Sequence, residues 1–226
     1  MDVGAVYRAA RGRVEELVRP LSRSQLATVV PGCPHWTVRD LVAHLTGVAA
    51  DRVAGRREGW GTDEWTAAQV SERRGRSVEE LLGEWGAVAA PLETTLSADG
   101  RGGRRLVIDA VTHEHDLRGA LHLPPEVGLE DEAYALAFRS YLAALGERAT
   151  AAGLAPLVVI TADGPFPVGD GGHPVTAHTS RHELFRALAG RRSEHQVRAW
   201  RWSADADPWL DVMNQFGPLP EIDVRE

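Results

Sequence analysis

The sequence predicts an α+β protein, in which a helical bundle that reaches about residue 152 precedes a small α/β unit. Across the first two-thirds of the chain, apolar residues recur at spacings of three and four, the period of amphipathic helices. Capping signals divide this part into separate helices. After Gly153 the pattern changes to a β-branched run and to segments punctuated by glycine and proline. We therefore predict two domains, residues 1–152 and residues 153–226.

The first helix is predicted over residues 2–19, where Val6 and Val14 belong to one apolar face. Pro20 ends it, because proline lacks the amide donor that a helix interior needs. Residues 21–34 are expected to form a connection.

A second helix begins at a sharply defined point. Thr37 is a favourable N-cap, and Asp40 three residues later completes a capping box. Trp36 stands just before the cap, where it can form a hydrophobic staple. We expect this helix to run to about Arg57. His44 falls within its apolar stripe, and a lone histidine there is more often a structural core residue than a ligand.

Residues 58–76 are expected to form a loop over the end of the bundle. The tryptophans in this stretch, Trp60 and Trp65, can wall a pocket, or they can simply pack their amphipathic rings on the core. A capping box at Ser77 and Glu80 then opens a third helix, which reaches about Leu96.

A turn is predicted over residues 98–103, before a fourth helix that contains the sequence VIDAVTHEHDLRGAL, residues 107–121. A fifth helix is predicted over about residues 130–152. The second domain is expected to contain several short elements: a strand at residues 157–161, a hairpin over 163–174, a strand at 175–178, a helix at 182–188, a strand or helix–strand junction at 195–202 and a helix at 208–216.

The fourth helix carries the densest group of polar residues in an apolar pattern. Asp109 and His113 are four residues apart, so they point the same way from adjacent turns. Together with His44 from a facing helix, they can hold a metal ion in the bundle core. Two imidazoles and one carboxylate suit zinc with an open fourth position, and the same donors also bind non-haem iron(II).

The alternative is a simple hydrogen bond between Asp109 and His113 on a helix surface. Flanking apolar residues make this helix largely buried, and burying these polar groups without a partner would cost several kcal/mol. That cost favours the metal. Glu114 and His115 lie on other faces, where we expect them to face solvent or to support the ligands. Asp116 and Arg118 can orient a ligand or pair with neighbouring groups, and a functional role for either is less expected than a structural one.

Composition excludes several classes of function. All 25 basic residues are arginines, so lysine Schiff-base chemistry and P-loop phosphate binding are excluded. The net charge of −7, without a basic block, argues against nucleic acid as a partner. No apolar run is long enough for a membrane span, and no signal peptide is evident, so we expect a cytoplasmic protein. Cys33 is the only cysteine, which excludes an internal disulfide, and we take it as incidental.

Two stretches, CPHWTVRDLVAHLTGV and VIDAVTHEHDLRGAL, resemble the mycothiol-dependent maleylpyruvate isomerase family of the DinB/YfiT-like metalloprotein superfamily. The tail, TSRHELFRALAGRRSEHQVRAWRW, is similar to the sterol-carrier-like C-terminal domain of that family. The resemblance covers most of the chain. It implies a DinB-like four-helix bundle in residues 1–152 and a sterol-carrier-like α/β domain in residues 153–226.

The resemblance also implies one divalent metal ion, usually zinc, held by a histidine and a Glu-x-x-x-His pair. The first histidine matches His44 and the second matches His113. The glutamate of the pattern falls on Asp109, which is one methylene shorter. Either the helix must therefore lie closer to the metal, or a water molecule must bridge.

The thiol mycothiol would bind with its sulfur at the open metal position, and Trp36 and Trp60 are the candidate residues for contact with it. A metal-stabilised thiolate is a nucleophile at neutral pH, so isomerisation or S-transfer on a small electrophile is expected. Arg191 or Arg192 can hold a substrate carboxylate, although a helix-terminal or solvated role is equally compatible with the sequence. A non-catalytic binding protein for a small ligand and a structural metal site remain the alternatives.

Overall fold

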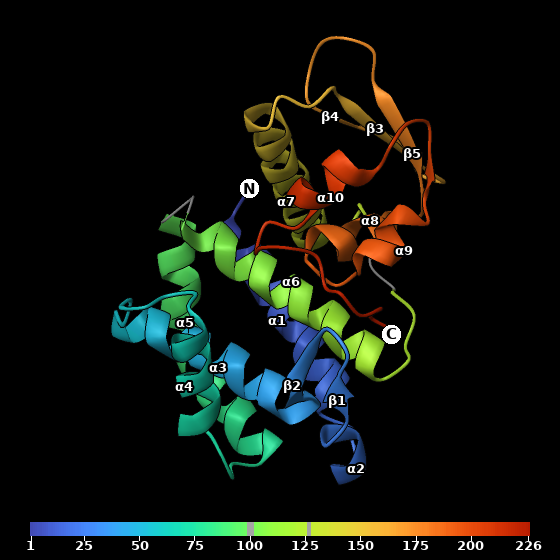
Figure 1. Cartoon of the computed structure of the whole chain (residues 1–226). Helices are drawn as coiled ribbons and strands as arrows, with labels where there is room; N and C mark the ends of the chain where they lie inside the picture. The colour runs from blue at the N-terminus through green and yellow to red at the C-terminus, as the bar shows by residue number, and fades with distance from the viewer. Residues whose placement is uncertain (99–101, 126–127) are drawn as a thin grey trace. The chain divides into compact units, whose positions relative to one another are not determined.

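The computed structural model describes residues 1–98, 102–125 and 128–226 (Figure 1). The chain forms two compact units, residues 1–137 with Glu226 and residues 138–225. The long helix α7 (Glu132–Ala151) belongs partly to each of them. A compact unit need not be a domain that folds alone, so the division into domains 1–152 and 153–226 stays a prediction. The turn predicted over residues 98–103 lies largely outside the described residues.

The first unit is built around four helices: α1 (Val3–Val18), α3 (Val38–Ala54), α5 (Val78–Ala98) and α6 (Gly102–Ala120). Both α1 and α3 pack against α5 and α6, which closes a bundle with one core (Figure 1). Each of these helices was predicted from its apolar period. The largest fully buried side chain in the described chain, Trp85, lies in this core, where its indole donates a hydrogen bond to the Tyr7 hydroxyl at 2.9 Å.

The capping boxes predicted from the sequence are confirmed. The Thr37 amide donates to the Asp40 carboxylate at 3.1 Å, and the Asp40 amide donates to the Thr37 hydroxyl at 3.2 Å. Ser77 and Glu80 exchange the same pair of bonds at the start of α5. Each reciprocal pair satisfies two amides that the first helical turn leaves without a partner. The start of α3, which carries His44, is therefore set by local sequence.

Two segments were predicted wrongly as irregular. Residues 21–34 contain the short helix α2 (Arg23–Leu26) and the start of a hairpin of β1 (Val29–Val30) with β2 (Cys33–Thr37). The predicted loop over residues 58–76 contains α4 (Asp63–Glu72), which packs on α3.

The helix α4 has a weak apolar period, so tertiary packing rather than pattern stabilises it. Gly47 of α3 makes this packing possible, because a Cβ atom there would lie 2.6 Å from the Cβ of Gln69. The Thr62 hydroxyl caps the start of α4 by accepting a hydrogen bond from the Trp65 amide at 3.3 Å.

The second unit contains a four-stranded sheet in the order β4-β3-β5-β6. The strands β3 (Leu157–Thr161) and β4 (Gly164–Val168) form an antiparallel hairpin, and β5 (Val175–His178) pairs parallel with β3. The remaining elements are α8 (Arg181–Leu188), α9 (Glu194–Arg198), β6 (Arg201–Trp202) and α10 (Asp207–Met213). A helical N-terminal region followed by a unit with strands confirms the predicted α+β class. The likeness of this unit to a sterol carrier remains a prediction.

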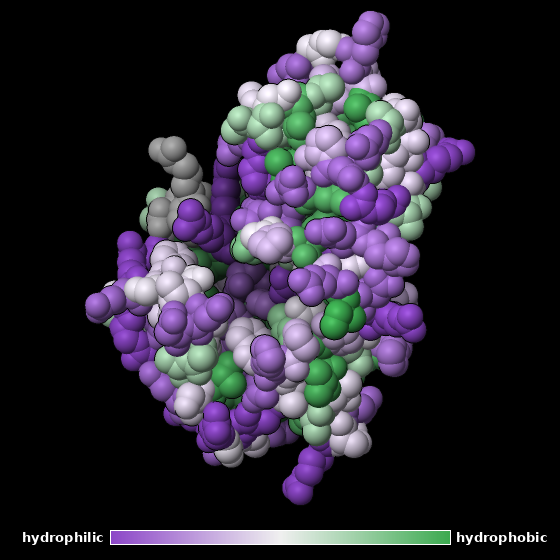
Figure 2. Space-filling view, viewed as in Figure 1, coloured by the Kyte–Doolittle hydropathy of each residue, from purple (hydrophilic) through white to green (hydrophobic). Residues whose placement is uncertain are grey.

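On the face that Figure 2 shows, hydrophobic residues are scattered among hydrophilic ones. Among the described residues, no helix has the length and apolar character that a membrane span requires.

Candidate metal centre

Helix α6 places three polar side chains in one row. Asp109 and His113 are separated by one turn, and Asp116 follows His113 by three residues, so the imidazole lies between two carboxylates. His113 and Asp116 are buried, whereas the side chain of Asp109 is 31% exposed. The row therefore reaches from the bundle core towards solvent at Asp109.

Helix α3 brings His44 to the same place, because α3 and α6 pack against each other. Its Nε2 atom lies 3.7 Å from Oδ1 of Asp109, and Nε2 of His113 lies 3.5 Å from the same oxygen. One ligand atom from each residue falls within 4.8 Å of the others. The structure thus brings together the three residues that the sequence nominated as metal ligands.

The spacing of these atoms fits a shared ion better than direct hydrogen bonds. Separations of 3.5 and 3.7 Å exceed the usual range for a hydrogen bond between nitrogen and oxygen. Two donors that each lie about 2.0 Å from a tetrahedral zinc ion are separated by roughly 3.3 Å. The two separations from Asp109 exceed that value by about 0.2 and 0.4 Å. The Asp109 carboxylate therefore lies near both imidazoles despite its shorter side chain.

Asp116 fixes the orientation of the His113 ring. Its Oδ2 atom lies 2.9 Å from Nδ1, which places the Nδ1 proton in that hydrogen bond and turns Nε2 towards Asp109. A carboxylate behind a histidine ligand is the usual support of a metal site.

The charges around His113 also change its protonation. Burial lowers the pKa of His113, but the hydrogen bond with Asp116, the contact with Cys33 and the charge of Asp109 outweigh it and raise the pKa to about 10. In the metal-free protein this ring is therefore an imidazolium at neutral pH. His113 would have to give up its Nε2 proton in order to bind a metal ion through that atom.

His44 is oriented by packing instead. Its Nδ1 atom is buried and has no hydrogen-bond partner among the residues that the structure describes. The ring centroid of Trp36 lies 4.8 Å from that of His44 and 6.1 Å from that of His113. The half-buried indole therefore covers both imidazoles, beside the position proposed for a bound cofactor.

The neighbouring residues of the same stretch have structural contacts. Glu114 is fully buried and accepts hydrogen bonds from Arg13 at 2.9 and 3.1 Å and from Arg118 at 3.2 Å. His115 is buried beside Tyr134, with ring centroids 5.4 Å apart. The expectation that Glu114 or His115 faces solvent was therefore wrong, because α6 is covered on nearly all sides.

Sequence reasoning missed two residues of the site. The spacing His-x-x-Asp was available as a signal for Asp116, because three residues separate neighbours on a helix face. Cys33 begins β2, and its Sγ atom lies 3.7 Å from Oδ2 of Asp116. It was taken as incidental, and no local pattern indicates that the hairpin delivers it to α6.

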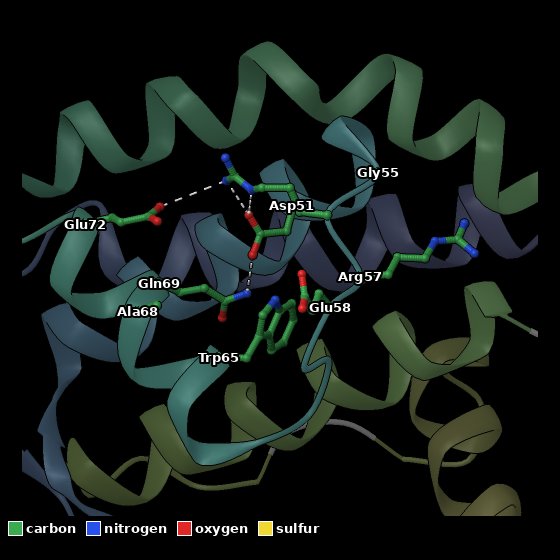
Figure 3. A pocket seen from close by; sticks show the side chains of 9 residues that line it. Asp51, Gly55, Arg57, Glu58, Trp65, Ala68, Gln69 and Glu72 are labelled. Atoms are coloured by element: carbon green, nitrogen blue, oxygen red, sulfur yellow. Dashed lines mark hydrogen bonds and ion pairs between the residues drawn. The ribbon is translucent and has the colours of Figure 1, made fainter.

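Trp60 packs against Trp65, with ring centroids 6.3 Å apart. Trp65 lines a cavity of about 480 Å³ between the end of α3 and α4, together with Asp51 and Gln69 (Figure 3). Gln69 donates to Asp51 at 2.9 Å, and Arg56 donates to the same carboxylate at 2.7 Å. This cavity has none of the three candidate ligands in its lining, so it is separate from the metal centre.

The two candidate catalytic arginines follow α8 in the second unit. Arg192 is buried and donates two hydrogen bonds to Glu183, at 2.7 and 2.8 Å. Burial raises the pKa of Glu183, but its bonds and charge interaction with Arg192 outweigh this and lower it. Arg191 is half-buried and donates to the carbonyl of Ala189 at 2.7 Å. The bonds to Glu183 fix the direction of the Arg192 guanidinium.

The fold and the cluster together define a four-helix-bundle protein whose core offers a His-Asp-His site suited to one divalent ion. A family model described as the mycothiol maleylpyruvate isomerase N-terminal domain matches residues 7–123, slightly more than half of the chain. The chain belongs to this family.

Two crystal structures of the mycothiol-dependent maleylpyruvate isomerase, one of them a histidine-to-alanine mutant, are similar in fold. The mutant gives a TM-score of 0.57 at 15% sequence identity, and the other gives 0.55 at 14%. Each match covers 97% of this chain and 94% of that chain. A comparison with curated protein sequences found no match.

Proposed function

We propose that this protein is a metal- and thiol-dependent enzyme that isomerises a small electrophilic substrate, with mycothiol as the thiol. The convergence of His44, Asp109 and His113 at metal-ligand spacing carries the proposal. Membership of the mycothiol maleylpyruvate isomerase family supports the choice of thiol and reaction. S-transfer onto the same kind of substrate is the closest variant, because it needs the same nucleophile.

In this proposal the three residues hold the ion, for which the donor set suits zinc. When bound, the ion supplies the positive charge that lowers the pKa of a thiol and holds it as a thiolate. A thiolate can add reversibly to an electron-poor double bond, so that rotation about the resulting single bond, followed by elimination, returns the thiol and changes the geometry of the substrate.

The protein's own residues prepare the site for this chemistry. Asp116 keeps a proton on Nδ1 of His113, so that the lone pair of Nε2 is directed at the ion once the second proton has left. Trp36 covers the two imidazoles with an apolar surface, which limits the access of water to that side. The partial exposure of Asp109 marks the side from which a thiol would approach.

The other candidates are proposed for substrate contacts. Arg191 or Arg192 would hold a carboxylate of the substrate. Arg192 would do so while its guanidinium also holds Glu183 with two bonds. Trp60 stays a candidate for contact with the thiol, although its ring packs on Trp65 beside the cavity that is separate from the metal centre.

The proposal is tested by titrating the cobalt-substituted protein with mycothiol and recording the visible spectrum. The titration uses Cys33→Ser protein, in which only the added thiol can supply a sulfur ligand. We expect one Co²⁺ per chain and a sulfur-to-cobalt charge-transfer band when the thiol is added. In this Cys33→Ser background, His44→Ala should lose the ion, whereas His35→Ala, a change of an exposed histidine in β2, should keep it.

Three results would count against the proposal. A spectrum that mycothiol leaves unchanged would remove the enzyme hypothesis in favour of a binding protein. Full Co²⁺ occupancy of His44→Ala in the Cys33→Ser background would refute the ligand assignment. Unfolding upon chelation of the metal, with no response to thiol, would indicate a structural site.

A further inference from the structure

Each of the two ring nitrogens of His113 faces a different group of polar side chains. Nε2 faces Asp109 and His44, and Nδ1 faces Asp116. Cys33 lies beside Asp116, on the Nδ1 side. We propose that Cys33, His113 and Asp116 form a second metal position, which binds a thiophilic divalent ion such as Zn²⁺ or Cd²⁺.

The atom separations are compatible with one ion. A thiolate about 2.3 Å and a carboxylate oxygen about 2.0 Å from a tetrahedral zinc ion lie roughly 3.5 Å apart. Sγ of Cys33 lies 3.7 Å from Oδ2 of Asp116. Nδ1 of His113 lies 2.9 Å from the same oxygen, so this pair must open by about 0.4 Å to the tetrahedral spacing of roughly 3.3 Å. One ligand atom from each of the three residues falls within 4.8 Å of the others.

The surroundings favour binding once the ion is in place. Asp116 is fully buried and His113 nearly so, which keeps water from competing for these donors. Cys33 is only half-buried at the beginning of β2, so it offers a path of entry. Sulfur, nitrogen and oxygen donors together suit zinc and cadmium, and they exclude magnesium and calcium, which take oxygen ligands.

Binding exchanges protons for the ion. The Cys33 thiol gives up its proton to form the metal–sulfur bond, and His113 gives up the Nδ1 proton that Asp116 accepts in the metal-free protein. If both positions fill, the ring bridges two ions that are about 6 Å apart, as estimated from metal–nitrogen bonds of about 2.0 Å on either side of the ring.

The competing explanation is that Cys33 only donates a weak hydrogen bond to Asp116. A Cd²⁺ titration, followed by the ultraviolet absorption of the cadmium–thiolate bond, separates the two. Cys33 is the only cysteine, so the band reports on this residue alone. The measurement needs neither thiol nor substrate, and its outcome does not depend on the proposed enzyme activity.

We expect the wild-type protein to develop the thiolate band as Cd²⁺ is added. His44→Ala, which disables the first position, should bind one equivalent with the same band. Cys33→Ser should remove the band, and Asp116→Ala should weaken the Cd²⁺ affinity that the band reports by tenfold or more. Asp51→Ala is the matched control, because it removes another buried carboxylate of the same unit that makes no contact with the cluster.

Two results would overturn the second position. One is the absence of a thiolate band in both the wild type and His44→Ala, although the wild type binds Cd²⁺. The other is a band whose Cd²⁺ dependence is the same in Asp116→Ala and Asp51→Ala, since this would mean that the thiol binds alone. The wild-type titration stands even if a variant fails to fold.

Discussion

Glu114 and His113 are neighbours in the sequence, but the structure gives them different roles: Glu114 joins two helices, and His113 is a candidate metal ligand. The variant Glu114→Gln tests whether these two roles are independent. The Glu114 carboxylate is fully buried and accepts hydrogen bonds from Arg13 of α1 and Arg118 of α6. Successive residues of a helix project about 100° apart, so this carboxylate lies on a different face from the metal-ligand row. It ties α6 to α1 and is not one of the three candidate metal ligands.

Glutamine keeps the size of Glu114 but removes its charge and replaces one acceptor by a donor that faces arginine donors. Removing one partner of a buried ion pair costs about 3–5 kcal/mol. We expect about 3 kcal/mol, the lower end of the range, because glutamine retains one acceptor oxygen. That loss is a fifth or more of the free energy of unfolding of a typical domain.

The assay is urea denaturation of the metal-free protein, followed by circular dichroism and tryptophan fluorescence, together with a metal titration of the folded variant. We expect lower stability and a metal affinity within threefold of the wild type. Glu16→Gln, at an exposed position of α1, should change stability by less than about 0.5 kcal/mol. Wild-type stability in Glu114→Gln, or a metal affinity more than tenfold lower in the folded variant, would refute the separation of roles.

Three further changes have defined outcomes. Asp116→Asn removes the charged hydrogen bond that raises the pKa of His113 to about 10. Because the pKa of His113 is higher in the folded than in the unfolded protein, its protonation stabilises the folded metal-free protein fully below about pH 6.5, and this stabilisation is lost as the pH rises towards 10. The variant should therefore have a lower free energy of unfolding at neutral pH, and an NMR titration should show that its His113 loses a proton at a lower pH than in the wild type. A wild-type ring that titrates near 6.5 would contradict the reasoning. Tyr7→Phe leaves the buried indole N–H of Trp85 without its acceptor and should lower the free energy of unfolding by about 1–3 kcal/mol in the same denaturation assay; an unchanged value would show that this bond contributes nothing. Ser77→Ala should cost about 1 kcal/mol by opening the capping box of α5, and an equal effect of Ser77→Gly would point to a cause other than the cap.

The helices of the bundle were predictable because their signals are local. An apolar period and the side-chain caps at Thr37 and Ser77 fix where α3 and α5 begin, and these signals act within a few residues. The helix α4 was not predictable in this way. It is stabilised by contact with Gly47 of α3, which lies more than fifteen residues before it in the chain.

The residues of the site also differ in whether a local sequence signal or only tertiary packing indicates them. Asp109 and His113 were nominated because a spacing of four places them on one helix face. His44 was nominated because its apolar stripe should face that helix and because it matches the first histidine of the family pattern. Asp116 carried a usable signal at a spacing of three that was given too little weight. Cys33 carried none, because its place beside α6 depends on a hairpin whose two strands are only two and five residues long.

By itself, the sequence determined the α+β class, the four helices of the bundle and the pairing of Asp109 with His113 on one helix face, because periodicity, caps and i,i+4 spacing act over one or two turns of a helix. His44 was matched to this pair only through the facing helix and the family pattern. Tertiary structure decided which polar neighbours of His113 face its ring and which lie in the ion-pair network with α1. These contacts depend on how each helix is rotated and packed. The contact between Cys33 and Asp116, for example, joins residues that are more than eighty positions apart in the chain. No local pattern contains that information.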